Sequence, residues 1–114
     1  MDNNLEVIMG LIVNAGDAKS HAMEAIREAK TGNIEEAYQK IRNADKALVE
    51  AHHSQTSLLS EEARGNHIEI SLLMVHSQDH LMTAIAFKDL AKEIIDVDFD
   101  NDHTLAQPLL EHLR

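Results

Sequence analysis

Apolar side chains recur along most of the chain in alternating steps of three and four residues, the spacing typical of α-helices. The pattern is clearest over residues 34–59, where large and small side chains alternate on one face: Ile34, Ala37, Ile41, Ala44, Leu48, Ala51, Gln55 and Leu58. Residues 4–31 repeat it, with one polar interruption at Lys19, and residues 67–95 form a third segment. We therefore predict an all-α, antiparallel three-helix bundle.

Two polar segments separate the predicted helices. In the first, Gly32 suits the left-handed conformation that ends a helix, and Asn33 with Glu36 forms a capping-box pattern for the next helix. The second covers residues 60–66 and contains Gly65. Inside the first helix, Gly10 and Gly16 indicate either a partner that approaches the helix or small-residue packing against a neighbouring helix.

The third segment is apolar around nearly its whole circumference. Its apolar residues are Ile68, Ile70, Leu72, Leu73, Met74, Val75, Leu81, Met82, Ile85, Phe87, Leu90, Ile94 and Ile95. A helix that is apolar on every side is usually buried on every side, and two partner helices cannot surround it. We therefore predict a homo-oligomer with this helix at its centre, over the alternative of a merely apolar helix in a monomer.

The composition changes after residue 95. Residues 96–114 carry four of the ten net negative charges, so we divide the chain into a three-helix domain, 1–95, and an acidic C-terminal tail, 96–114, either disordered or a short helix. Alternating aspartates in the tail invite comparison with a calcium-binding loop. Asn101 stands where that loop needs Gly, and Gln107 where it needs Glu, which argues against calcium.

Composition excludes several classes of function. The 114 residues include no Cys, three aromatic residues and eight His, with a net charge of −10. Disulfides and thiolate chemistry are therefore impossible, and the acidic balance argues against nucleic acid as a partner. We see no signal peptide and no segment of the roughly 20 apolar residues that span a membrane. We expect a soluble, cytoplasmic protein that does not insert into the membrane.

Candidate chemistry gathers in the third segment. His76 and His80 lie about 40° apart on a helix, with Gln78 and Asp79 between them in the chain. Asp79 interrupts an apolar stripe, where a lone carboxylate must be protonated, hydrogen-bonded or bound to a cation. Copies of Asp79 meeting at a symmetry axis would suit a hard divalent ion or shared protons. The stripe consists of Leu72, Val75, Asp79, Met82 and Ala86.

Other interpretations of the histidines compete. Spacing of four residues resembles half a zinc site, but Ser77 stands where zinc proteases have Glu, which disfavours catalytic zinc. Histidines of an apolar helix are also often simply part of the core. Tight turns near residues 32 and 63 would bring polar and small residues level with His76, namely Asn14, Gly16, Glu50, His52 and His53. A neutral imidazole there could act as a nucleophile in phosphoryl transfer, with a partner protein as donor because no P-loop or kinase motif is present.

Three stretches resemble a known family. The motif Val75–Met82, Val-His-Ser-Gln-Asp-His-Leu-Met, closely resembles Val-His-Ala-Gln-Asp-His-Leu-Met of the lactose/cellobiose-type enzyme IIA of the bacterial phosphoenolpyruvate-dependent sugar phosphotransferase system. Residues 9–18 and 50–56 match the family as well, and the resemblance covers about residues 4–95.

The resemblance implies a homotrimer of three-helix subunits, which is a nine-helix bundle. It implies that His76 accepts phosphate from the histidine phosphocarrier protein and passes it to a cognate IIB, as a phosphotransferase component with a phosphohistidine intermediate. Gln78 and His80 correspond to residues flanking the family's active site, and Asp79 to an axial ligand of a divalent metal such as magnesium. Gln78, about 200° from His76, could more readily serve a neighbouring subunit.

Two departures from the family pattern stand out. Ser77 replaces the usual Ala and adds a hydroxyl that we expect near the nucleophile, and the sequence leaves the family pattern from Asp96 onward. The paired His52 and His53 resemble cellobiose- or chitobiose-type members more than lactose-type ones. The sugar and the cognate IIB stay open. The alternative function is a non-enzymatic trimeric helical adaptor that binds a partner without phosphoryl transfer.

Overall fold

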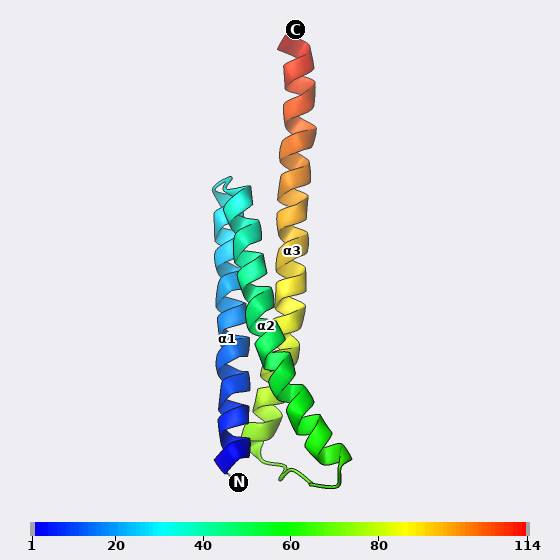
Figure 1. Ribbon diagram of the computed structural model, residues 1–114. Coiled ribbons are helices and arrows are strands. Elements are labelled where there is room, and N and C mark those ends of the chain that lie inside the picture. Colours follow the sequence, from blue (N-terminus) through cyan, green and yellow to red (C-terminus); the bar gives the residue numbers. More distant parts are fainter. Residues whose placement is uncertain (1, 114) are drawn as a thin grey trace.

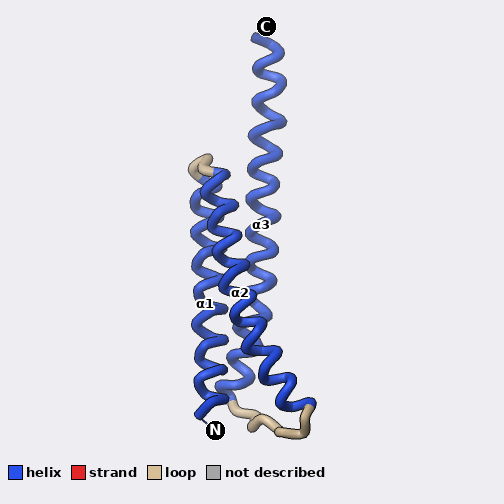
Figure 2. Tube along the Cα trace, in the orientation of Figure 1, coloured by secondary structure: helices blue, strands red, loops and turns tan. Residues whose placement is uncertain are grey.

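The structure, a computed structural model, describes the backbone of residues 2–113 and the side chains of residues 4–100. It contains three helices, α1 (Asp2–Lys30), α2 (Ile34–Ala63) and α3 (Leu72–Leu113), and the described residues include no strand. Figure 1 shows α1 and α3 running in the same direction, with α2 antiparallel to both. Nearly all of the chain is helical, with two short connections at opposite ends of the bundle (Figure 2). The predicted all-α, three-helix fold is confirmed.

The core is built largely from small side chains. The interior face predicted for α2 is confirmed, and alanines on α1 let these two helices lie close together. α3 contributes fewer buried residues to the core than α1 or α2, and two of them, Leu81 and Ile95, are large and fully buried. The apolar seam of α1 passes through Ala18, so Lys19 lies beside the seam instead of interrupting it. That seam consists of Ile8, Leu11, Ala15, Ala18, Ala22, Ala25 and Ala29.

The turn between α1 and α2 confirms one expectation and corrects another. Gly32 has a positive φ of 84°, as expected for the residue that ends a helix. The Asn33–Glu36 capping box was wrong, because the Asn33 side chain makes no capping hydrogen bond to α2. Its amide instead donates to Glu28 at 3.0 Å and to Thr31 at 3.2 Å, which ties the turn back onto α1.

The connection between α2 and α3 is longer than predicted and shifts the register of the two helices. Helix α2 continues to Ala63 and α3 begins at Leu72, so Ile68 lies in the connection and not on the third helix. Glu62 accepts a hydrogen bond from the backbone N–H of Ile68 at 2.8 Å, and Gly65 adopts a φ of 90°. In Figure 1 the last turns of α2 diverge from the other helices toward this connection.

Helix α3 does not end at residue 95. It continues unbroken to Leu113 and projects past the α1–α2 turn (Figure 1). Its first turn beyond residue 95 belongs to the bundle, because Tyr38 of α2 donates a hydrogen bond to Asp96 at 2.5 Å and Lys92 pairs with the same carboxylate at 3.0 Å. The proposed boundary at residue 95 therefore falls within one helix. The side chains of the predicted acidic tail beyond residue 100 lie outside the described residues.

One face of α3 has no neighbour within the subunit. The stripe that contains Asp79 points away from α1 and α2, and Ser77, Leu81, Ala84, Ala91 and Ile95 form the buried face instead. Asp79 is therefore exposed in the single subunit, and its predicted place at the centre of a homo-oligomer stays a prediction. Large apolar side chains of α3 are exposed on and beside this stripe: Leu72, Val75, Met82, Leu90 and Val97.

Candidate functional site

His76 and His80 stack on the surface of α3. Their ring centroids are 5.6 Å apart and the ring planes differ by 12°. His76 is exposed and His80 is half-buried, so the first ring is open to a partner while the second is held by its surroundings. The spacing of four residues on one continuous helix produces this arrangement directly, because such residues are neighbours on the helix surface.

Lys19 of α1 holds the second ring. Its Nζ lies 2.9 Å from Nδ1 of His80, which joins α1 to α3 across 61 positions of sequence. A lysine ammonium can only donate hydrogen bonds, so Nδ1 of His80 is the acceptor. Lys19 is therefore a residue of the candidate site that the sequence did not identify as such.

The surroundings of His80 favour its neutral form. Burial lowers the pKa of His80 below its ordinary value, because a charged imidazolium loses hydration there. The positive charge of Lys19 and the neighbouring His76 lower this pKa further, while Asp79 opposes them weakly. A neutral ring with an occupied Nδ1 can offer a single N–H at its other nitrogen.

The two glycines inside α1 differ in their surroundings. A Cβ added at Gly16 would lie 3.6 Å from Nε2 of His80, whereas one added at Gly10 would meet no other atom within 4 Å. Small-residue packing within the subunit therefore does not account for Gly10. At Gly16, the missing side chain leaves the Nε2 edge of His80 facing open backbone.

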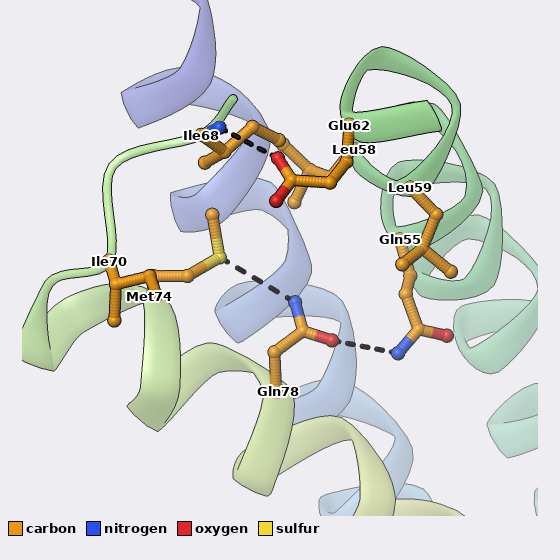
Figure 3. Close-up of a pocket in the computed structure, with 8 residues that line it drawn as sticks. All are labelled: Gln55, Leu58, Leu59, Glu62, Ile68, Ile70, Met74 and Gln78. Atoms are coloured by element: carbon orange, nitrogen blue, oxygen red, sulfur yellow. Dashed lines mark hydrogen bonds between the residues drawn. The ribbon is translucent and has the colours of Figure 1, made fainter. Parts of the chain in front are cut away.

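Gln78 does not lie with the histidine pair. Gln55 of α2 donates a hydrogen bond to Gln78 at 2.7 Å, and the Gln78 amide lies 3.8 Å from the sulfur of Met74 (Figure 3). Both glutamines line a largely apolar pocket of about 230 Å³ between α2, the α2–α3 connection and α3. Within one subunit, Gln78 is thus turned toward α2 and away from His76.

Ser77 is buried in the bundle. Its hydroxyl donates to the backbone carbonyl of Met74 at 2.7 Å, one turn earlier in α3. The expectation that this hydroxyl lies near the nucleophile was wrong, because residues 76 and 77 point about 100° apart on a helix. Ser77 occupies the position of a small core residue, as the usual Ala would.

The register places the second-helix histidines elsewhere than predicted. Two contacts show which residues of α2 and α3 lie level: the hydrogen bond of Gln55 with Gln78, and the 2.8 Å ion pair of Asp45 with Lys88. In both pairs the midpoint of the two residue numbers falls between 66 and 67, whereas the prediction placed it near 63. The level of His76 on α2 is therefore near residue 57, about two turns beyond Glu50. His52 and His53 instead line a groove between α2 and α3. The other residues of this groove are Asp45, Leu48, Val49, Ile85 and Lys88.

Asp79 is exposed on the unpartnered face of α3. Among residues 4–100, no three or more His, Asp or Glu side chains gather closely enough to hold a metal ion. A single subunit thus offers one carboxylate here, and any metal at this position would need ligands from other copies. Carboxylate oxygens are nevertheless the donors that magnesium prefers.

Two residues of the site region escaped prediction for the same reason. Lys19 and Gln55 were visible only as polar residues within apolar helical patterns, and their partners lie on a different helix. A polar residue that breaks such a pattern is the one available signal, and it does not identify the partner.

None of the helices, over the residues described, is long and apolar enough to cross a membrane.

Comparison with known proteins gives consistent results. Residues 6–98 match the family described as "PTS system, Lactose/Cellobiose specific IIA subunit". The lichenan-specific phosphotransferase enzyme IIA component of Bacillus subtilis is 49% identical over 92 residues, which is 81% of this chain and 84% of that protein. The cellobiose-specific EIIA component of Lactococcus lactis is 48% identical over 94 residues, 82% of this chain and 81% of that protein.

Solved structures show the same fold. The cellobiose-specific enzyme IIA of Bacillus anthracis has a TM-score of 0.87 at 46% identity, covering 90% of this chain and 94% of that one. The IIA(Chitobiose) protein of the Escherichia coli phosphotransferase system, solved in complex with HPr, has a TM-score of 0.76 at 37% identity. That alignment covers 87% of this chain and 96% of that one.

Proposed function

The chain belongs to the lactose/cellobiose-specific IIA family of the sugar phosphotransferase system, and on that premise we propose that His76 carries the phosphoryl group. The observation that supports this assignment is an exposed imidazole stacked on a second, neutral one at the motif position. A phosphotransferase component needs such a nucleophile on its surface, because both its donor and its acceptor are proteins.

The transfer is a displacement at phosphorus. A lone pair on a ring nitrogen of His76 forms a new P–N bond while the P–N bond of the donor phosphohistidine breaks. The donor imidazole leaves with that electron pair and takes up a proton, and the proton on the other nitrogen of His76 is released. Repeating the same step toward a cysteine or histidine of the next component returns His76 to its starting state. Positioning and charge compensation carry most of the catalysis in such transfers.

The donor is HPr, the histidine phosphocarrier protein, and the acceptor is a cognate IIB. Support for the donor comes from the complex of HPr with the IIA(Chitobiose) protein, which shares this fold. The transported sugar is a β-disaccharide of the cellobiose, chitobiose or lactose type. Relatives named for lichenan, cellobiose and galactose are 48–49% identical to this chain, so identity does not distinguish between sugars.

Three copies assemble through the unpartnered face of α3. The stripe from Leu72 to Ala86 is apolar apart from Asp79, and covering it with other copies would remove exposed Leu72, Val75 and Met82 from water. A threefold axis would bring three Asp79 carboxylates together, a set of hard oxygen donors that suits magnesium. The metal would offset the repulsion between these carboxylates and so stabilise the trimer.

A labelling experiment tests the assignment of His76. Phosphoenolpyruvate, enzyme I and HPr should together label the protein once per subunit, and His76→Ala should abolish the label. Circular dichroism of the variant provides the control for folding. Continued labelling of a folded His76→Ala protein would refute the assignment. A wild-type protein that forms trimers but takes no label would instead favour the non-enzymatic adaptor.

A second experiment tests the axial metal. Asp79→Leu should eliminate magnesium measured by elemental analysis while light scattering still reports a trimer, because leucine extends the apolar stripe. Absence of metal from the purified wild-type trimer would mean that shared protons, not a metal, compensate the carboxylates. A wild-type protein that stays monomeric would refute the proposed assembly.

A further inference from the structure

Lys19 brings a positive charge from α1 to the back of the histidine pair. Its side chain is half-buried, and its Nζ lies 2.9 Å from Nδ1 of His80. His80 in turn stacks on His76, with 5.6 Å between the ring centroids. The three side chains therefore form a row that runs from half-buried Lys19 on α1 to the exposed imidazole of His76 on α3.

We propose that Lys19 is a positioning residue for phosphoryl transfer, which holds His80 as its Nε2–H tautomer so that this N–H can donate to the phosphoryl group on His76. The inference rests on the proposed function of His76, and it assigns to Lys19 and His80 roles that the motif alone does not define. Lys19 acts through His80 and need not touch the phosphoryl group itself.

The tautomer follows from the hydrogen bond. An ammonium group has three donors and no acceptor, so the Nδ1 that faces Lys19 carries no proton. The single proton of neutral His80 must then reside on Nε2. Without Lys19, nothing else described in contact with His80 fixes the choice between the two ring nitrogens, and both tautomers become accessible.

The free edge of the ring has space for a ligand atom. Nε2 of His80 lies 3.6 Å from where a Cβ would stand at Gly16, so the missing side chain at this position leaves room beside the edge. An oxygen of a phosphoryl group carried by the stacked His76 can approach here and accept the Nε2–H bond. A Cβ at Gly16 would make only an ordinary contact with His80, so this geometry leaves room for the ligand without requiring glycine there.

The charge of Lys19 strengthens this donor. A cation that donates to one nitrogen of an imidazole polarises the ring and makes the opposite N–H a better donor. It also places a positive charge close to the developing phosphohistidine in a chain whose net charge is −10. Both effects favour the phosphorylated state and the transition state that leads to it.

Kinetics of the purified trimer test the proposal. Phosphorylated HPr is mixed with wild type, Lys19→Met, Lys19→Arg and the control Lys30→Met, and single-turnover transfer to the protein is followed. Lys30 is an exposed lysine three turns further along α1, so its replacement matches the change in charge. We expect Lys19→Met to be slower by about 10- to 100-fold, the effect of losing a charge-assisted hydrogen bond. Lys19→Arg should restore most of the rate, and Lys30→Met should behave as wild type.

Nitrogen-15 NMR of the imidazole rings provides a readout that a merely structural role would not change. In wild type we expect an unprotonated Nδ1 and a protonated Nε2 at His80, and in Lys19→Met a mixture of both tautomers. A wild-type His80 protonated at Nδ1 would overturn the proposal, even if Lys19→Met failed to fold. Wild-type transfer by folded Lys19→Met would overturn it as well. If His76→Ala is still labelled, the proposed function fails. If His76→Ala takes no label but Lys19→Met transfers at the wild-type rate, the proposed function stands and this inference fails.

Discussion

Tyr38 should titrate well above its ordinary pKa, and this prediction tests whether α3 beyond residue 95 belongs to the bundle. Its hydroxyl donates to Asp96 at 2.5 Å, and this bond together with burial and the charge of Asp96 raises the pKa of Tyr38 from 10.0 to about 12. The same bond and the charge of Lys92 lower the pKa of Asp96. The chain contains one Tyr and no Trp, so ultraviolet absorbance reports the phenolate of Tyr38 without interference.

The sign of the pH dependence differs at the two ends of the scale. Deprotonating Tyr38 would set a phenolate against the Asp96 carboxylate, so the stabilisation by this pair is present below pH 10 and is lost as the pH rises toward 12. Since the pKa of Asp96 is lowered, its contribution is present above the unfolded pKa and disappears as the pH falls through the folded value. Around neutral pH both contributions are complete.

The size of the effect follows from a hydrogen bond to a charged group. Such bonds contribute about 1.5–3 kcal/mol, and the partial exposure of Asp96 favours the lower end, so Tyr38→Phe should cost about 1–2 kcal/mol of unfolding free energy. For a chain of this size that corresponds to a melting temperature lower by about 4–8 °C. Phenylalanine keeps the ring packing, so the loss reports the hydroxyl alone.

The assay is an absorbance titration of wild type and Asp96→Asn, with circular dichroism recorded at each pH so that only helical protein is analysed. Urea unfolding of wild type, Tyr38→Phe, Asp96→Asn and the double variant, at one protein concentration, measures the coupling of the two side chains. A native Tyr38 that titrates at its ordinary value, or a coupling near zero, would refute the reasoning.

Other consequences of the packing can be measured in the same way. Leu81→Ala should cost about 2–5 kcal/mol in urea unfolding, because Leu81 is fully buried among all three helices; a loss below 1 kcal/mol would contradict this packing. Ser77→Ala should change stability by less than about 1 kcal/mol and leave the transfer rate unchanged, since the hydroxyl contacts Met74, at its carbonyl and its sulfur, and no residue of the histidine pair; a large fall in rate would return Ser77 to the site. Gly10→Ala should stabilise α1 by up to about 1 kcal/mol. Gly16→Leu should slow transfer, while Gly16→Ala should transfer nearly normally; equal rates for all three proteins would show that the space at Gly16 is not used.

The pattern of apolar residues determines most of this fold. Helices are local structures with a fixed period, so the interior face of α2 and the turn at Gly32 follow from spacing and from the one residue type that readily takes a positive φ. The eight-residue motif around His76 likewise identifies the family without any knowledge of packing. Both the fold class and the candidate nucleophile are therefore properties that neighbouring residues in the chain define.

Tertiary structure decided what depends on partners distant in sequence. The capping interpretation of Asn33 failed because its amide finds Glu28 instead, and the expected level of His52 failed because an eight-residue connection from 64 to 71 shifts the register by about two turns. The contact of Lys19 with His80 joins residues 61 positions apart, and a one-dimensional pattern shows only that Lys19 is polar. Periodicity reports which side of a helix is apolar, but only the packed helices determine what each polar residue on that side meets.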